Sequence, residues 1–190
     1  MKWKECISLI KADYAALVSG GGVKIRFLKM LIFNPSMNIT FWFRIGSYLK
    51  KKSGAFKLLY LLVSLIYYHY KFKTGIDLPL GTRIGPGLVF GHFGCIIISG
   101  RASLGSNVMI MQGVTIGSTH SAKGGVPHIG NHVVISAGAI IIGNVEIGDD
   151  VLVASGAVVT KDVEKGCVVA GVPAKIISHD GKKHVESYGM

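Results

Sequence analysis

Aliphatic residues recur at a fixed interval in the second half of the chain. From residue 129 onward they occupy every sixth position, at Ile129, Ile135, Ile141, Ile147, Val153 and Val159. A second register four residues later in each unit holds Val133, Ala139, Val145, Val151, Ala157 and Val163. The same period appears upstream at Ile84, Phe90 and Ile96, and again, shifted by two residues, at Leu104, Ile110 and Ile116. A period of six is neither helical nor a simple strand alternation, and it predicts a short strand followed by a turn.

Units of this kind predict a solenoid, because one unit cannot bury its apolar face alone. If three units make a triangular turn, residues 18 apart lie above one another at a spacing of about 4.8 Å. About five turns fit between Gly81 and Ile176, which gives a column about 24 Å long. One segment breaks the period, because the step from Ile116 to Ile129 is not a multiple of six. Its polar residues predict a loop that projects from the column, and such loops often carry function.

Residues 1–75 predict helices. Trp3, Ile7, Ile10, Tyr14 and Leu17 follow one another at spacings of 4, 3, 4 and 3 residues, which places them on one helical face. Glycines 20–22 are expected to end this helix. A second helix is expected over Val23 to Phe33, ending at Asn34-Pro35, because the residue before proline avoids the helical region. Two more are expected from Asn38 to about Lys52 and from Ala55 to about Phe72.

The last of these helices is apolar on nearly every side from Leu58 to Tyr70 and has lysines before and after this stretch. Thirteen residues cover only about 20 Å, short of the roughly 30 Å hydrocarbon core of a bilayer. We interpret the segment as a buried helix. The alternative is a helix that lies in a membrane interface.

Composition also divides the chain near residue 75, where the predicted helices end and the repeats begin. The 190 residues are 49% apolar, which excludes intrinsic disorder. Residues 1–75 hold 13 Lys or Arg against two acids, whereas residues 76–190 hold eight of each, and 21 of the 26 glycines lie from Gly75 onward. We therefore expect an α+β chain with a helical segment over 1–75, a solenoid domain over 76–178 and a polar C-terminal tail over 179–190.

The cysteines and the N-terminus indicate a cytoplasmic protein. Cys6, Cys95 and Cys167 are odd in number and far apart, so they form neither a disulfide framework nor a metal-ligand pattern. No apolar run is long enough to span a membrane, and the first residues lack the layout of a signal peptide. The basic helical part would permit contact with the inner face of a membrane. It shows no nucleic-acid-binding motif, and nucleic acid is not expected as a partner.

Three motifs carry a family resemblance. Ile76-Asp77-Leu78-Pro79 is followed by His92, fifteen residues after the aspartate; Gln112 to Gly117 reads QGVTIG, and Ala170 to Lys175 reads AGVPAK. With Arg44-Ile45-Gly46, these motifs resemble the hexapeptide-repeat acyltransferases, most closely the serine acetyltransferase branch, from about Phe43 to Ile177. The resemblance implies a left-handed parallel β-helix, a homotrimer with active sites between subunits, acetyl-CoA as donor and no metal.

The resemblance places the catalytic histidine at His92 and its partner carboxylate at Asp77. A hydroxyl is a poor nucleophile until a base takes its proton, and imidazole titrates near neutrality. A carboxylate on the other ring nitrogen fixes the tautomer and stabilises the imidazolium. The group that stabilises the oxyanion is not identified.

A binding groove for the donor is expected from stacking. Thr119, Ala137 and Ser155 are spaced by 18, so they should form a vertical file of small side chains that would admit a pantetheine arm. The resemblance implies donor contacts at Ala137 and Ser155 and near Thr160, Lys161 and Lys175, and the two lysines suit a nucleotide phosphate. Gly117 and Ser118, beside Thr119, complete the predicted set.

Some positions depart from the serine acetyltransferase pattern. The Arg-His pair of that branch falls on Gly125 and Val126, the acid before the histidine is Gly91, and residues 34–43 contain no acid. These groups would bind the charges of an amino acid, and a dry pocket without them leaves those charges unpaired.

We therefore favour a sugar hydroxyl as acceptor, as in surface polysaccharide synthesis, contacted by His120, Ser121 and His128. Serine O-acetylation, a step of cysteine biosynthesis, is the alternative. A remote one is a zinc enzyme that resembles the hexapeptide carbonic anhydrases, because His128 and His132 are near neighbours. A non-catalytic binding module is the remaining alternative.

Overall fold

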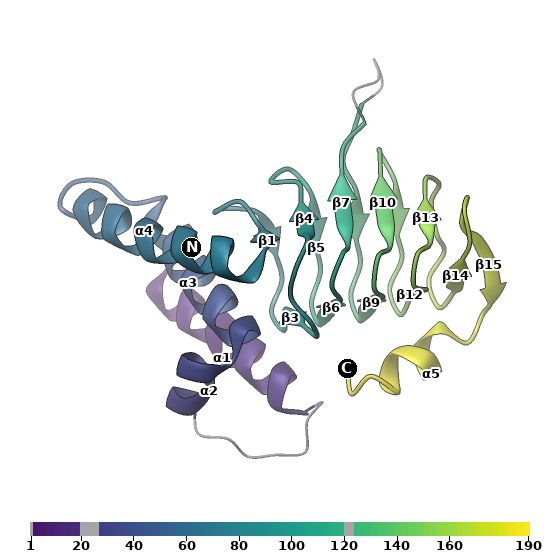
Figure 1. The fold of residues 1–190 in the computed structure, drawn as a ribbon, viewed down its shortest axis with the longest axis horizontal. Coiled ribbons are helices and arrows are strands. Elements are labelled where there is room, and N and C mark those ends of the chain that lie inside the picture. Colours follow the sequence, from purple (N-terminus) through teal and green to yellow (C-terminus); the bar gives the residue numbers. More distant parts are fainter. Residues whose placement is uncertain (1, 20–26, 120–123) are drawn as a thin grey trace.

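A computed structural model describes residues 2–19, 27–119 and 124–190. In Figure 1, helices gather at one end of a column of short strands, and the C-terminal helix returns along the side of the column. The helices are α1 (Trp3–Ser19), α2 (Phe27–Phe33), α3 (Pro35–Leu49), α4 (Phe56–Thr74) and α5 (Gly181–Glu186). The column begins directly after α4, because Gly75 caps that helix in the left-handed conformation and the first strand starts at Ile76.

The strands form three walls. Wall 1 contains β1 (Ile76–Asp77), β4 (Ile96–Ile98), β7 (Thr115–Gly117), β10 (Ile140–Ile142) and β13 (Val158–Val159). Wall 2 contains β2 (Arg83–Ile84), β5 (Ser103–Leu104), β8 (His128–Ile129) and β11 (Glu146–Ile147). Wall 3 contains β3 (Val89–Phe90), β6 (Val108–Ile110), β9 (Val133–Ile135), β12 (Leu152–Val153), β14 (Val168–Ala170) and the antiparallel β15 (Lys175–Ser178). The chain visits the walls in turn, and this is the predicted left-handed β-helix.

The six-residue period is confirmed as the core of this column. Every aliphatic residue that defined the period is buried, from Ile84 at 8% exposure to Ile141 at 0%. Residues 18 apart lie above one another, as Ile141 does with Val159 and Ile135 with Val153. Each side chain therefore packs on its counterpart in the next coil.

The long segment between β7 and β8 changes the register on all three walls. Thr115 pairs with Ile140, Ser103 with His128, and Val108 with Val133, so the sequence offset between counterparts is longer across this coil than across the regular ones. The predicted file of Thr119, Ala137 and Ser155 is therefore wrong at Thr119. That residue lies beside Gly143, where a Cβ would be 3.6 Å from the Thr119 Cγ2.

Two features of the helical part also differ from expectation. The third helix starts at Pro35, because the Asn34 side chain accepts a hydrogen bond from the Met37 N–H and proline suits the first helical position. The interpretation of α4 as a buried helix is wrong. Only the face with Val63 and Tyr67 is covered, while leucines on the opposite face are exposed. The predicted glycine stop at 20–22 and the start of the second helix lie outside the described residues.

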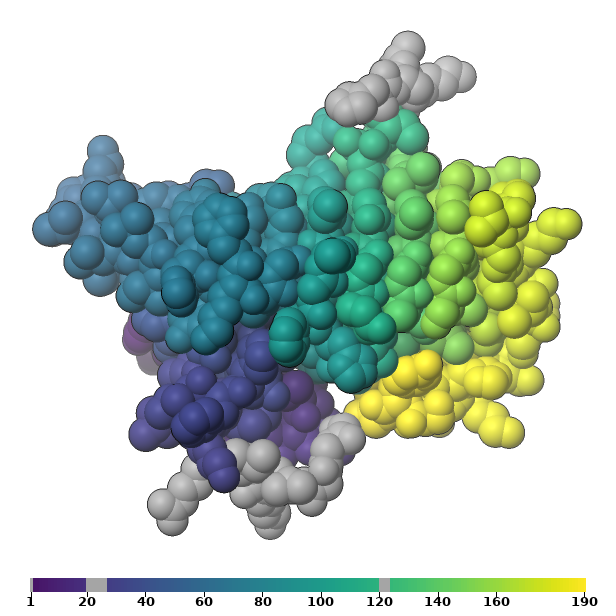
Figure 2. Space-filling view, viewed as in Figure 1, coloured from purple at the N-terminus to yellow at the C-terminus, as the bar shows by residue number. Residues whose placement is uncertain are grey.

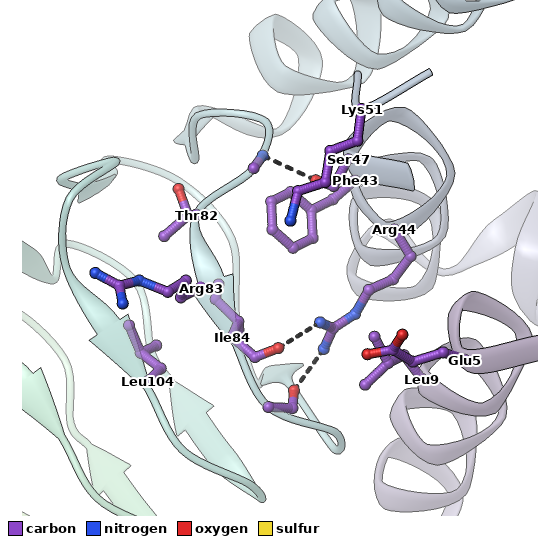
Figure 3. A pocket seen from close by; sticks show the side chains of 12 residues that line it. Glu5, Leu9, Phe43, Arg44, Ser47, Lys51, Thr82, Arg83, Ile84 and Leu104 are labelled. Atoms are coloured by element: carbon purple, nitrogen blue, oxygen red, sulfur yellow. Dashed lines mark hydrogen bonds between the residues drawn. The ribbon is translucent and has the colours of Figure 1, made fainter. Parts of the chain in front are cut away.

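A buried ion pair joins the helices to the first coil. Arg44 of α3 binds both carboxylate oxygens of Asp13 of α1, at 2.8 and 3.0 Å. Its remaining donors bind the carbonyl oxygens of Ile84 and Gly85, each at 2.7 Å (Figure 3). The Asp13 Oδ1 also accepts from the N–H groups of Gly87 and Leu88. The pair thus fixes two helices and one turn of the column relative to one another.

The segment predicted as a polar tail contains α5. Its Val185 is 2% exposed and packs on the outer face of wall 3, against residues that include Val134 and Leu152. Figure 2 shows this C-terminal segment, in yellow, lying against the green coils. Among the helices of the described residues, none is both long and apolar enough to cross a membrane.

Candidate active site

The corner between wall 3 and wall 1 repeats from coil to coil. Backbone hydrogen bonds of 2.9 Å join successive turns, from Gly113 N–H to Gly94 O, from Gly138 N–H to Gln112 O, and from Gly156 N–H to Ala137 O. Gln112, Ala137 and Ser155 therefore stack as a vertical file along this corner. Ser155 is exposed and Ala137 half-buried, so the file forms a surface.

His92 opens this corner in the first coil. It follows β3 and precedes β4, in a turn whose Gly94 lies next to Gly113 of the coil above. His92 and its neighbour Phe93 are both exposed. The predicted base thus stands at the end of the file that contains Ala137 and Ser155.

Asp77 lies on β1, beside β4. It pairs in register with Ile97, and its side chain is 51% exposed. The Lys71 ammonium at the end of α4 lies 2.7 Å from the Asp77 Oδ1. The structure therefore places Asp77 and His92 on neighbouring segments of the first two coils. The Asp77 carboxylate binds Lys71 and makes no hydrogen bond to the His92 imidazole.

The other edge of wall 1 holds most of the remaining predicted donor contacts. Gly117 pairs with Ile142, and Ile141 pairs with Val159, so continuing the register places Thr160 opposite Ile142 and Lys161 opposite Gly143. Lys175 lies at the first edge instead, because it pairs with Ala170 at the end of β14 and the Ala174 N–H donates to the Val158 carbonyl at 2.8 Å. Two groups of candidates thus flank wall 1: Ala137, Ser155 and Lys175 on one edge, and Gly117, Ser118, Thr160 and Lys161 on the other.

The predicted acceptor contacts are not all in one place. His128 lies on wall 2, where its Nδ1 is 2.7 Å from the Ser103 hydroxyl. His132 is also separate, with its Nδ1 3.5 Å from the Asp150 carboxylate. Within this chain His128 is therefore on a different wall from the Asp77 strand. His120 and Ser121 lie outside the described residues.

Two glycines at the unusual positions lie close to neighbouring side chains. A Cβ at Gly91 would lie 2.5 Å from the Met111 Sδ, and a Cβ at Gly125 would lie 2.5 Å from the Asn144 Cβ. The Asn144 Cβ therefore occupies the space that an arginine at position 125 would need, whereas the flexible end of the Met111 side chain would have to shift to admit an acid at position 91.

Sequence reasoning missed two residues of this region. Gln112 takes the place in the file that was assigned to Thr119. The long segment adds seven residues to its coil, so the counterpart of Ala137 lies 25 residues earlier rather than 18, and this correction would have identified Gln112. Lys71 binds Asp77 from a helix, and no spacing rule in the sequence predicts which lysine does so.

A cavity of about 360 Å³ lies elsewhere, between the helices and the first coil (Figure 3). Its lining includes Glu5, Lys51 and Arg83, and it contains neither His92 nor Asp77.

Comparisons with known proteins agree with this geometry. A family model described as "Bacterial transferase hexapeptide (six repeats)" matches residues 127–161. A serine acetyltransferase of Staphylococcus xylosus is 36% identical over 128 residues, which are 67% of this chain and 59% of that protein. The chain thus spans about three fifths of the length of such curated relatives.

Solved structures extend the likeness to nearly the whole chain. A Neisseria gonorrhoeae serine acetyltransferase in complex with serine superimposes with a TM-score of 0.77 at 27% identity, over 93% of this chain and 70% of that one. A Brucella abortus serine acetyltransferase in complex with coenzyme A gives a TM-score of 0.76 at 28% identity, over 93% and 69%. By repeat, sequence and fold, the chain is a hexapeptide-repeat protein similar to the serine acetyltransferases.

Proposed function

We propose that the chain is an acetyl-CoA-dependent O-acetyltransferase in which His92 is the general base. The observation that carries the proposal is the position of His92 at the end of the stacked file of Gln112, Ala137 and Ser155. That arrangement puts an imidazole beside a surface strip that includes the small side chains of Ala137 and Ser155, as transfer from a long, thin thioester carrier requires.

His92 would perform both proton transfers. An acetyl thioester supplies an activated acyl group. The imidazole takes the proton of the acceptor hydroxyl as the hydroxyl oxygen bonds to the acetyl carbon. It returns that proton to the sulfur as the carbon–sulfur bond breaks, so the imidazole ends the cycle neutral.

Asp77 is assigned the role of orienting this imidazole. Lys71 engages the Asp77 Oδ1, so Oδ2 is the oxygen that we assign to the ring N–H of His92. The side chain is half-exposed and has room to turn toward the neighbouring segment. A carboxylate in this position selects the tautomer and stabilises the imidazolium that forms during transfer.

The donor is assigned to wall 1. Its outer face runs between Ala137, Ser155 and Lys175 on one edge and Thr160 and Lys161 on the other. Small side chains leave space for the pantetheine arm, and the two exposed lysines supply point charges for phosphates. The coenzyme A complex of the Brucella relative supports this choice of donor.

L-Serine is the acceptor that we propose. Our sequence-based preference for a sugar hydroxyl receives no support from the relatives, whereas the serine alternative is supported by serine acetyltransferases among both the sequence relatives and the solved structures. Because Met111 and Asn144 fill the space beside Gly91 and Gly125, the serine ammonium and carboxylate would need partners other than side chains at those two positions.

An acceptor assay tests this proposal. Release of coenzyme A thiol from acetyl-CoA is measured with L-serine and, separately, with a panel of mono- and oligosaccharides. We expect serine-dependent release by the unaltered protein and a loss of roughly 10²–10⁴-fold in His92→Ala and Asp77→Asn. The matched control His184→Ala replaces an exposed histidine of α5 and should retain full activity. Release with saccharides alone would refute serine as acceptor, and full activity of His92→Ala would refute the assigned base.

A further inference from the structure

Helix α4 presents a broad apolar face to solvent. Leu58 is 67% exposed, Leu65 62% and Phe72 81%, and the same face carries Leu59, Leu61, Leu62, Ile66 and Tyr68, all exposed. At about 100° per residue, these side chains cover roughly half the circumference of the helix. In Figure 2 the helix projects, in blue, from the end of the molecule opposite the yellow C-terminal coils.

This face cannot rotate into the protein. The opposite side of α4 is held by Val63 and Tyr67, which are 6% and 1% exposed. The Tyr67 hydroxyl donates a hydrogen bond to the Leu78 carbonyl, and Gly75 caps the helix directly before the first strand. The leucines therefore remain outside in the folded chain.

Lysines flank the apolar face at both ends. Lys51, Lys52 and Lys57 lie at its start and Lys73 at its end. Residues 1–75 contain only two acids, Glu5 and Asp13, and Asp13 is buried against Arg44. The surface around α4 therefore has a strong excess of positive charge and complements a negatively charged partner.

The shape and charge of this face favour a lipid surface over a second copy of the chain. A seam between two helices needs only a narrow stripe of alternating contacts, whereas a helix in a membrane interface buries a wide apolar arc. Pairing two copies through α4 would also bring their lysines together with few acids to offset them. Burial of the apolar side in the headgroup region, to a depth of about 5–10 Å, places the lysines at the level of anionic phosphates.

We propose that α4 docks this protein on the surface of an anionic bilayer. The helix lies parallel to the membrane, with the face from Leu58 to Phe72 inserted and the flanking lysines in contact with lipid headgroups.

Vesicle flotation tests the proposal with the full chain. The probes are vesicles of phosphatidylcholine alone and vesicles of phosphatidylcholine and phosphatidylglycerol in equal amounts, at low and at high salt. We expect the protein to float with the anionic vesicles at low salt and to bind them more weakly as salt rises. Absence of flotation with the anionic vesicles would overturn the proposal.

Variants separate the apolar and the electrostatic contributions. Leu61→Glu combined with Leu65→Glu should abolish flotation, while Ile177→Glu, which also alters an exposed apolar residue but on β15, should not. Lys51→Gln and Lys57→Gln should each weaken binding about fivefold, which is the effect of about 1 kcal/mol per lysine. Circular dichroism and melting temperature check that each variant is folded.

Two further results would contradict the proposal. One is unchanged flotation of the folded double glutamate variant, which would assign binding to another surface. The other is that the unaltered protein binds no lipid but self-associates without it, as measured by light scattering, and that the same variant abolishes this self-association. That result would assign the α4 face to a second copy of the chain.

Discussion

The Asp13–Arg44 pair is the most deeply buried charged contact of the described residues. Burial raises the pKa of the Asp13 carboxyl, and the hydrogen bonds from Arg44, Leu88 and Gly87 act against that shift. Arg44 in turn depends on Asp13, because its other partners are two neutral carbonyl groups. Removal of one charge would leave the other buried without compensation.

Asp13→Asn should therefore destabilise the protein strongly. We expect the free energy of unfolding to fall by about 3–5 kcal/mol, measured by urea denaturation. Glu5→Gln is the control, since Glu5 is an exposed acid on the same helix and its loss should change stability by less than about 0.5 kcal/mol. Equal stability of the two variants would show that the pair does not hold the helices on the column.

At the residue scale, the sequence predicts positions in the repeat better than it predicts side-chain contacts. His92, Ala137 and Ser155 were found from motif and spacing, and the structure places all three on one corner. The ion pair between Lys71 and Asp77 could not be predicted, because it depends on where the last turn of α4 meets the first strand.

At the scale of elements, periodicity predicts whatever repeats along the chain. The three walls follow from the six-residue period, because each coil buries the same positions. The prediction failed where one coil is longer, since the extra residues shift Thr119 out of the file without changing the composition. It also failed for α4, because hydrophobicity alone does not distinguish a helix covered by protein from one with an uncovered face.

The stacked core should respond sharply to loss of volume. Ile141 is fully buried between Ile116 and Val159, so Ile141→Ala should lower the free energy of unfolding by about 2–5 kcal/mol. Ile177→Ala removes the same atoms from an exposed site and should cost less than about 1 kcal/mol. Thermal and urea unfolding measure both. Similar losses in the two variants would contradict a core built from these repeats.

At the scale of the whole molecule, we propose that neighbouring subunits complete the active site. The outer face of wall 1 carries Ile97, which is 53% exposed, next to Asp77 in the ladder. The candidates on its two edges form an open surface in a single chain, and a second subunit would close it into a groove. We propose a homotrimer for this reason.

Light scattering on the purified protein tests the trimer. We expect a mass about three times the 20.3 kDa of one chain. Ile97→Glu should shift the mass toward the single chain and reduce acetyl transfer in parallel. A monomer with full activity would show that one chain holds a complete site.

The most direct test of the central claim is a crystal structure of the protein with coenzyme A. We predict that the pantetheine arm runs along wall 1 past Ala137 and Ser155, and that the sulfur lies within reach of the His92 imidazole. Coenzyme A bound on wall 2 or wall 3, or a His92 ring that points away from the sulfur, would contradict the assignment of His92 as the base of acetyl transfer.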